Sequence, residues 1–97
     1  MIKVGDKVVV VELEPIDIEQ TDLKAGDIGV VELMATEDYE PDDYCHVRFS
    51  NVSYAKRCFN LNSDGTYVMY MRQLQLANKK LTESSKEQES VARRMKK

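Results

Sequence analysis

Short stretches of alternating hydrophobic and polar residues, separated by turn residues, run along most of the chain. The clearest alternation lies at residues 44–49, where Cys45, Val47 and Phe49 would face one side of a strand and Tyr44, His46 and Arg48 the other. Residues 7–13 and 28–34 are rich in β-branched side chains, which favour extended backbone. We therefore predict strands at residues 7–13, 28–34 and 44–49.

The pattern continues in the second half of the chain. Asp64-Gly65 is typical of a hairpin turn, because glycine supplies the positive φ that tight turns need. Residues 54–61 are compatible with either a further strand or an ordered loop. We expect the remaining elements to be a strand at 66–71, about one helical turn at 72–74 and a short closing strand at 75–77.

Two features interrupt this regular pattern. Residues 14–27 are acidic and poorly periodic, and Pro15 ends the first strand because proline cannot donate to a ladder. We predict a long loop there, with a short irregular strand at residues 16–18. Gly29 lies inside the second predicted strand, and it indicates a bulge or a close approach of the backbone.

Five or six short strands in about 77 residues predict an all-β domain, either a barrel or a sandwich. A barrel is the more economical solution, because closure removes exposed strand edges. The chain of 97 residues has room for one such domain. The core that we expect consists of Val8, Val10, Ile28, Val30, Val47, Phe49, Val68, Tyr70, Leu74 and Leu76.

Charge divides the chain into two parts. Residues 1–77 contain 7 Lys and Arg against 14 Asp and Glu, whereas residues 78–97 contain 7 against 3. An acidic body repels phosphate, so any contact with nucleic acid would have to use the basic tail. We expect residues 78–97 to be a disordered or marginally helical tail that a partner orders. Its candidate contacts are Lys79, Lys80, Arg93, Arg94, Lys96 and Lys97.

The motifs along residues 3–77 resemble the SH3-like barrel of KOW-type and related small domains. The motifs are Gly5-Asp6 with Val8 and Val10, Gly26-Asp27-Ile28-Gly29 with Val31, Val47-Arg48-Phe49, and Leu74 with Leu76. The stretch from Val47 to Phe49, followed by Val52 and Tyr54, is also similar to photosystem I subunit IV, an SH3-like docking subunit. Small acidic proteins with charged tails also resemble many phage-encoded proteins. The resemblance implies a five- to six-stranded SH3-like barrel, a fold that hosts many unrelated functions.

Candidate catalytic and metal-binding groups are few. Cys45 and His46 are adjacent on a predicted strand, so they point to opposite faces and cannot form a thiolate–imidazolium pair without a bulge. A zinc site of these two residues and Cys58 lacks a fourth ligand. The acidic residues 37–43 lack the spacing of a calcium loop and are better explained as a solvated loop. We expect a protein that is not an enzyme and that uses no metal or cofactor.

Aromatic residues near loops are the better indication of a binding role. Residues 51–57 form a basic, aromatic stretch on the acidic body, and we select Tyr39, Tyr54, Lys56 and Arg57 as partner contacts. The chain contains no tryptophan, unlike a typical peptide-binding SH3 groove. The first strand is apolar on both faces, and the core of one domain buries only one of them. Val9 and Val11 would therefore be buried by another element, which is the 14–27 loop, the tail or a second copy of the protein.

The leading hypothesis is a protein-interaction module that binds a macromolecular partner. The alternative is an accessory factor of nucleic-acid or transcription/translation machinery, whose basic tail contacts phosphate. The chain has no Cys-x-x-Cys motif, secretory signal or apolar run of membrane-spanning length. These features favour a cytoplasmic location, which would be the host cytoplasm for a phage-encoded protein.

Overall fold

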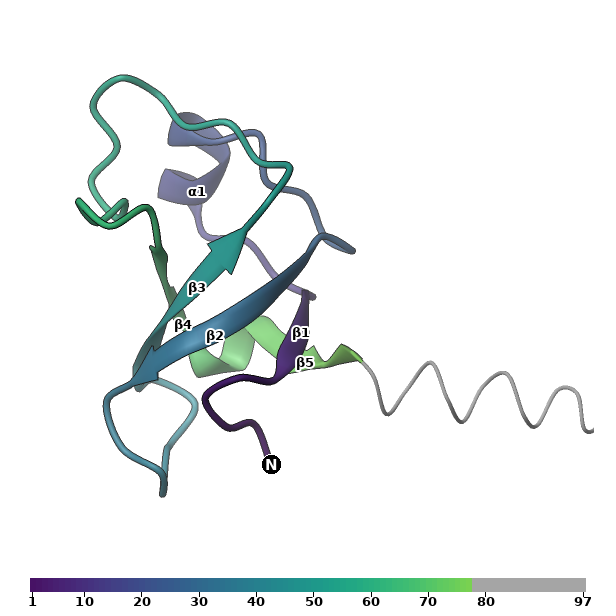
Figure 1. Ribbon diagram of the computed structural model, residues 1–97. Coiled ribbons are helices and arrows are strands. Elements are labelled where there is room, and N and C mark those ends of the chain that lie inside the picture. Colours follow the sequence, from purple (N-terminus) through teal and green to yellow (C-terminus); the bar gives the residue numbers. More distant parts are fainter. Residues whose placement is uncertain (78–97) are drawn as a thin grey trace, which may run out of the picture.

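The computed structural model describes residues 1–77, which form one five-stranded antiparallel sheet (Figure 1). The strand order is β4-β3-β2-β1-β5, so the last strand returns to pair with the first. The contacts predicted at Lys79, Lys80, Arg93, Arg94, Lys96 and Lys97 lie outside the described residues. The strands are β1 (Lys7–Val10), β2 (Ile28–Met34), β3 (Tyr44–Phe49), β4 (Tyr67–Tyr70) and β5 (Leu74–Leu76).

The all-β class and most of the element positions are confirmed. The strands predicted at 28–34 and 44–49 match β2 and β3 residue for residue, and the first strand is shorter than predicted. The helical turn predicted at 72–74 is the 3-10 turn η1 (Met71–Gln73). Residues 54–61 form a loop rather than a further strand, with one isolated bridge from Tyr54 to Thr21 and one from Leu61 to Tyr67 of β4.

The loop predicted at 14–27 is wrong over its first part, because Pro15–Gln20 form the helix α1. The fixed φ of Pro15 suits the first position of a helix, where no backbone N–H is needed. Two positions later, Asp17 Oδ2 accepts a hydrogen bond from the Glu14 backbone N–H at 2.8 Å. These two local features start a helix in a segment that has too little periodicity to predict one.

The sheet is strongly curled, because η1 alone connects its two edge strands. Five flat strands would place β4 and β5 about 19 Å apart. The chain from Tyr70 to Leu74 advances only about 8 Å at the rise of a 3-10 helix. The two edges therefore approach each other. No pairing joins β4 to β5 among the described residues, so the sheet is not closed.

The predicted core is right for three strands and wrong for two. Val8, Val10, Val47, Phe49 and Leu74 are buried, and Leu76 packs against the core. Four other residues of the predicted core are half-buried or exposed: Ile28, Val30, Val68 and Tyr70. Their neighbours Val31, Tyr67 and Met69 are buried instead.

Strand pairing explains this correction. Residues that lie opposite each other on antiparallel strands share a face. Val31 and Tyr67 both pair with Val47, and Met69 pairs with Cys45, so all three point inward with their partners. The sequence of β4, Tyr-Val-Met-Tyr, is apolar on both faces, so alternation alone cannot assign its inner side.

Gly29 permits a close approach between strands, as predicted. A Cβ atom at this position would lie 2.6 Å from Val47 Cγ1 and 2.9 Å from two atoms of the Phe49 ring. The core side chains of β3 therefore fill the space above Gly29. The register of β2 and β3 shifts between Val31 and Leu33, so the bulge lies farther along β2 than the glycine.

Candidate functional site: a hollow lined by aromatic side chains

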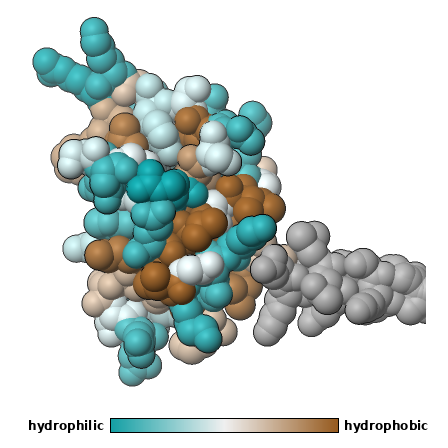
Figure 2. Space-filling model, in the orientation of Figure 1, coloured by the Kyte–Doolittle hydropathy of each residue, from teal (hydrophilic) through white to brown (hydrophobic). Residues whose placement is uncertain are grey.

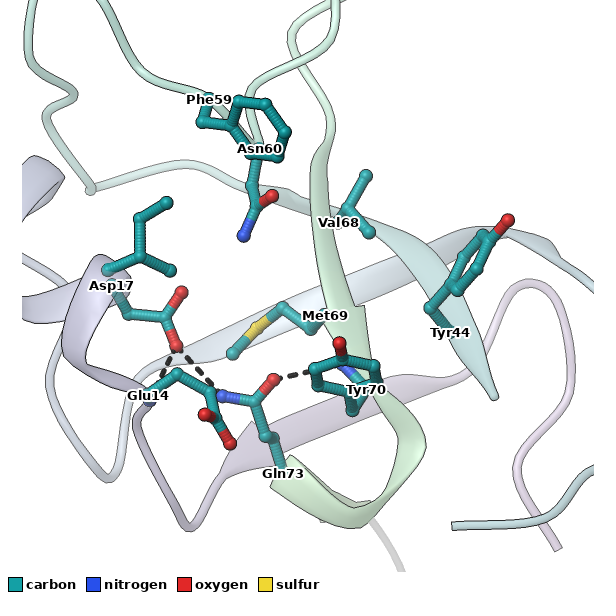
Figure 3. Close-up of a pocket in the computed structure, with 10 residues that line it drawn as sticks. Glu14, Asp17, Tyr44, Phe59, Asn60, Val68, Met69, Tyr70 and Gln73 are labelled. Carbon is teal, nitrogen blue, oxygen red and sulfur yellow. Dashed lines mark hydrogen bonds between the residues drawn. The ribbon is translucent and has the colours of Figure 1, made fainter. Parts of the chain in front are cut away.

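A surface hollow of about 370 Å³ lies between the start of α1 and the β4–η1 segment (Figure 3). We call it the aromatic hollow, because three of its lining residues carry exposed aromatic rings. It combines residues that are distant in the sequence. The lining residues are Glu14, Ile16, Asp17, Tyr44, Phe59, Asn60, Val68, Met69, Tyr70 and Gln73.

The three aromatic rings of the hollow face solvent. Phe59 is 82% exposed, Tyr44 50% and Tyr70 39%. Tyr44 and Tyr70 are cross-strand partners on β3 and β4, so their side chains share the outer face of the sheet. Phe59 comes from the loop before β4. Exposed aromatic rings beside a concavity are typical of protein-binding surfaces, since they offer large apolar area at low entropic cost.

The buried carboxylate of Asp17 holds the two sides of the hollow together. Asp17 is 2% exposed and accepts hydrogen bonds from Tyr67 Oη at 2.5 Å and Gln73 Nε2 at 2.8 Å. Gln73 Oε1 in turn accepts a hydrogen bond from the Tyr70 backbone N–H at 2.9 Å. Figure 3 shows the Asp17–Gln73–Tyr70 part of this network beneath the hollow. The network attaches α1 to β4 and η1, so the shape of the hollow is preorganised.

The same network changes the pKa of the Tyr67 hydroxyl. Burial, followed by the hydrogen bond to Asp17, raises the pKa of the Tyr67 hydroxyl well above its ordinary value. Tyr67 is fully buried, and a phenolate there would meet the Asp17 carboxylate directly. Tyr67 is thus a neutral hydrogen-bond donor that fixes Asp17, and it does not face the hollow.

Three carboxylates gather around one arginine at the end of the hollow that Glu14 lines. Arg72 lies 4.5 Å from the centre of the Tyr70 ring and bonds to Glu14 at 2.5 Å and Asp42 at 2.7 Å. A third carboxylate, Glu12, lies 3.8 Å from its Nε. One guanidinium therefore faces three carboxylates, which leaves an excess of two negative charges in this cluster. The Asp17 carboxylate adds a further acidic group that no cation pairs among the described residues.

The partner contacts selected from the sequence do not line this hollow. The Tyr39 side chain is half-buried, and its hydroxyl accepts a hydrogen bond from the Ile2 N–H at 3.1 Å. Tyr54 is also half-buried and stacks on Tyr67 at 5.6 Å between ring centres. Lys56 and Arg57 are exposed on the loop that leads to Phe59. Their contact with a partner stays a prediction.

Sequence reasoning missed Phe59 and misplaced Tyr70. Phe59 is the most exposed of the large hydrophobic side chains in the described part of the chain, and it follows a polar, basic stretch. An isolated aromatic residue next to Lys56 and Arg57 was the available signal. Tyr70 was assigned to the core because β4 is apolar on both faces, and strand pairing was needed to place it outside.

The expected placement of Cys45 and His46 is confirmed. Cys45 is fully buried, and His46 lies on the opposite face, half-buried, with Nδ1 3.3 Å from Asn62 Nδ2. Burial raises the pKa of the Cys45 thiol to about 11, so this cysteine is protonated near neutral pH. Within residues 1–77, no three His, Cys, Asp or Glu side chains gather as a metal site would require.

A second apolar surface covers the outer face of β1 and β2. Val9 pairs with Ile28 across the two strands, and Ile28 is 46% exposed. Val9 is half-buried and Val11 is 42% exposed. In Figure 2, apolar residues gather over the part of the molecule that β1 and β2 occupy in Figure 1. Self-association through Val9 and Val11 stays a prediction.

No helix among the described residues is long and apolar enough to cross a membrane. We compared the chain with protein-family models, curated proteins and solved structures. None of the three comparisons finds a match.

Proposed function

We propose that the protein is a non-enzymatic interaction module that binds another protein at the aromatic hollow. The observation that carries this proposal is the cluster of Tyr44, Phe59 and Tyr70, three exposed rings that border one preorganised concavity. Aromatic side chains in such a position contribute much of the binding energy in protein interfaces. The hydrogen bonds of Asp17 reduce the conformational entropy that binding would otherwise cost.

We further propose an SH3-like barrel as the fold. Three observations support it: the five antiparallel strands, the return of β5 to β1, and the curl imposed by the three-residue η1. A curled sheet with its edges close together approaches a barrel in shape. In this interpretation, the segment between β1 and β2, which contains α1, borders the binding surface.

The charge around the hollow supports a basic partner. The body of residues 1–77 carries twice as many acidic as basic residues, and Glu12, Glu14 and Asp42 lie together beside the hollow. Such a surface accelerates encounter with a positively charged protein and repels nucleic acid. The alternative function, an accessory factor of nucleic-acid or transcription/translation machinery, rests on the charge of residues 78–97 alone.

Affinity capture with hollow variants tests the proposal. Full-length protein is immobilised and exposed to native extract, with and without nuclease treatment, and the retained proteins are identified. Tyr44→Ser and Phe59→Ser remove exposed rings, so we expect each to weaken binding of the purified partner about tenfold or more. Leu33→Ser is the matched control, because Leu33 is 50% exposed and lies outside the hollow.

The outcomes separate the two functions. A partner that the wild type and Leu33→Ser retain, but the two hollow variants lose, supports binding at the hollow. Equal retention by all four proteins contradicts it. A signal that disappears with nuclease, and whose affinity falls steeply with salt, would favour the nucleic-acid alternative.

A further inference from the structure

We infer that the C-terminal segment Arg93-Arg94-Met95-Lys96-Lys97 of the same chain occupies the aromatic hollow. The inference shares the hollow with the proposed function, but its test needs no other protein. The segment would then compete with any partner for the same surface. Three observations carry the inference: the charge of the hollow, the chemistry of the segment and its distance along the chain.

The hollow presents the groups that a cationic peptide needs. Glu14 lines it and pairs with Arg72, which also pairs with Asp42 and Glu12. These three carboxylates exceed the single charge of Arg72 by two. Asp42 is the most accessible, because its side chain is 85% exposed. The charge of these carboxylates therefore favours a cationic segment beside the hollow.

The segment carries side chains that match both parts of the hollow. It contains four positive charges and one methionine in five residues. A guanidinium stacks on aromatic rings and forms paired hydrogen bonds with carboxylates. Arg72 over Tyr70 already shows this stacking within the molecule. The flexible thioether of Met95 suits the exposed ring of Phe59, since sulfur and aromatic carbon attract each other.

The length of the chain permits this contact. Gln73 lines the hollow, and Ala77 lies about 13 Å farther along β5. The 15 residues between Ala77 and Arg93 can span at most about 50 Å, which is ample for a return. Lys79 and Lys80 carry the same charge as Arg93 and Arg94 but lack the planar guanidinium, and they lie at the other end of residues 78–97. Lys79 and Lys80 therefore form a matched control pair.

Nuclear magnetic resonance of the full chain tests the inference. The ¹⁵N-labelled wild type is compared at low salt with Arg93→Glu/Arg94→Glu and with Lys79→Glu/Lys80→Glu, which change the net charge equally. We expect the first variant to shift the amide signals of Tyr44, Phe59 and Tyr70, and the second to leave them in place. Raising the salt to about 0.5 M should move the wild-type signals toward those of the first variant.

A variant on the other side of the contact tests whether the hollow itself binds the C-terminal segment. Phe59→Ser should shift the signals of residues 93–97, and because Phe59 is 82% exposed the sheet should be unaffected. The inference is overturned if both charge-reversal pairs give the same spectrum around the hollow. It is also overturned if the signals change on about tenfold dilution, since that would assign the contact to a second copy. Loss of partner capture with an intact tail contact would contradict the proposed function alone.

Discussion

Asp17 accepts hydrogen bonds from three donors that come from different parts of the chain. These are the Glu14 amide, the Tyr67 hydroxyl and the Gln73 side-chain amide. Burying a carboxylate to this degree has a large desolvation free energy, which hydrogen bonds from surrounding donors offset. Removal of any of these donors should therefore destabilise the folded protein. The arrangement makes single side chains at the base of the hollow sensitive to substitution.

Tyr67→Phe and Tyr54→Phe should therefore differ in effect, although each deletes one hydroxyl. Tyr67 donates to Asp17, so we expect its loss to reduce the free energy of unfolding by about 1–3 kcal/mol. The Tyr54 hydroxyl is buried and has no hydrogen-bond partner among the described residues. Its removal should be neutral or stabilising. Urea unfolding monitored by circular dichroism measures both, and equal losses would contradict the role of Asp17.

Alkaline pH should destabilise the protein through Tyr67. Because the pKa of the buried hydroxyl is raised above the ordinary value of 10.0, the folded state holds its proton more tightly than the unfolded state. That contribution is complete below pH 10 and is lost as the pH rises beyond it. We expect the free energy of unfolding to fall more steeply above pH 10 in the wild type than in Tyr67→Phe. If the free energy of unfolding falls equally steeply above pH 10 in both proteins, folding does not raise the pKa of Tyr67.

The two cysteines should react at different rates with a thiol reagent. Cys45 is fully buried and burial raises its pKa to about 11, whereas Cys58 is only half-buried. At pH 8 we expect one thiol to react with dithionitrobenzoate in the folded protein and the second only after unfolding. Cys58→Ala should abolish the fast phase and Cys45→Ala should keep it. The reverse result would place Cys45 outside the core.

At the scale of the elements, the packing of β2 against β3 depends on Gly29. Gly29→Ala would place a methyl group 2.6 Å from Val47 Cγ1, so the core must shift. Overpacking of this kind costs about 1–3 kcal/mol, which thermal unfolding would detect. In a Val47→Ala background the penalty should be smaller, because one of the two clashing side chains is shortened. An unchanged penalty in that background would mean that Val47 does not set it.

The positions of the strands could be predicted from the sequence, but their inner faces only in part. Alternation in β3 is unambiguous, because Cys45, Val47 and Phe49 are separated by polar residues. In β4 every residue is apolar, and its inner face is set by pairing with β3. Alternation is local information, whereas pairing is a property of the folded sheet.

The aromatic hollow was less predictable than the sheet, for the same reason. Its lining combines Glu14, Tyr44, Phe59 and Tyr70, which no local motif connects. The helix α1 borders it because of Asp17, whose partner Tyr67 lies fifty positions later in the chain. Only the aromatic content near loops indicated a binding role, and it pointed to Tyr39 and Tyr54, which are partly buried against the core and do not line the hollow.

At the scale of the whole molecule, the sheet needs both ends of its described chain. β5 pairs with β1 through Val8 and Leu76, and Leu74 is 5% exposed. We expect a chain that ends at residue 73 to lose the dispersed amide spectrum of a folded sheet, and a chain that ends at 77 to keep it. An unfolded 1–77 chain would show that residues 78–97 contribute to stability.

The pairing of β1 with β5 also has a consequence for synthesis. Val8 leaves the ribosome early, and its partner Leu76 follows 68 residues later. During that interval one edge of β1 is open, and the apolar Val8 and Val10 lack part of their cover. Strands β1 to β4 can assemble as they emerge, but the native sheet is completed only when residues 74–76 have left the exit tunnel.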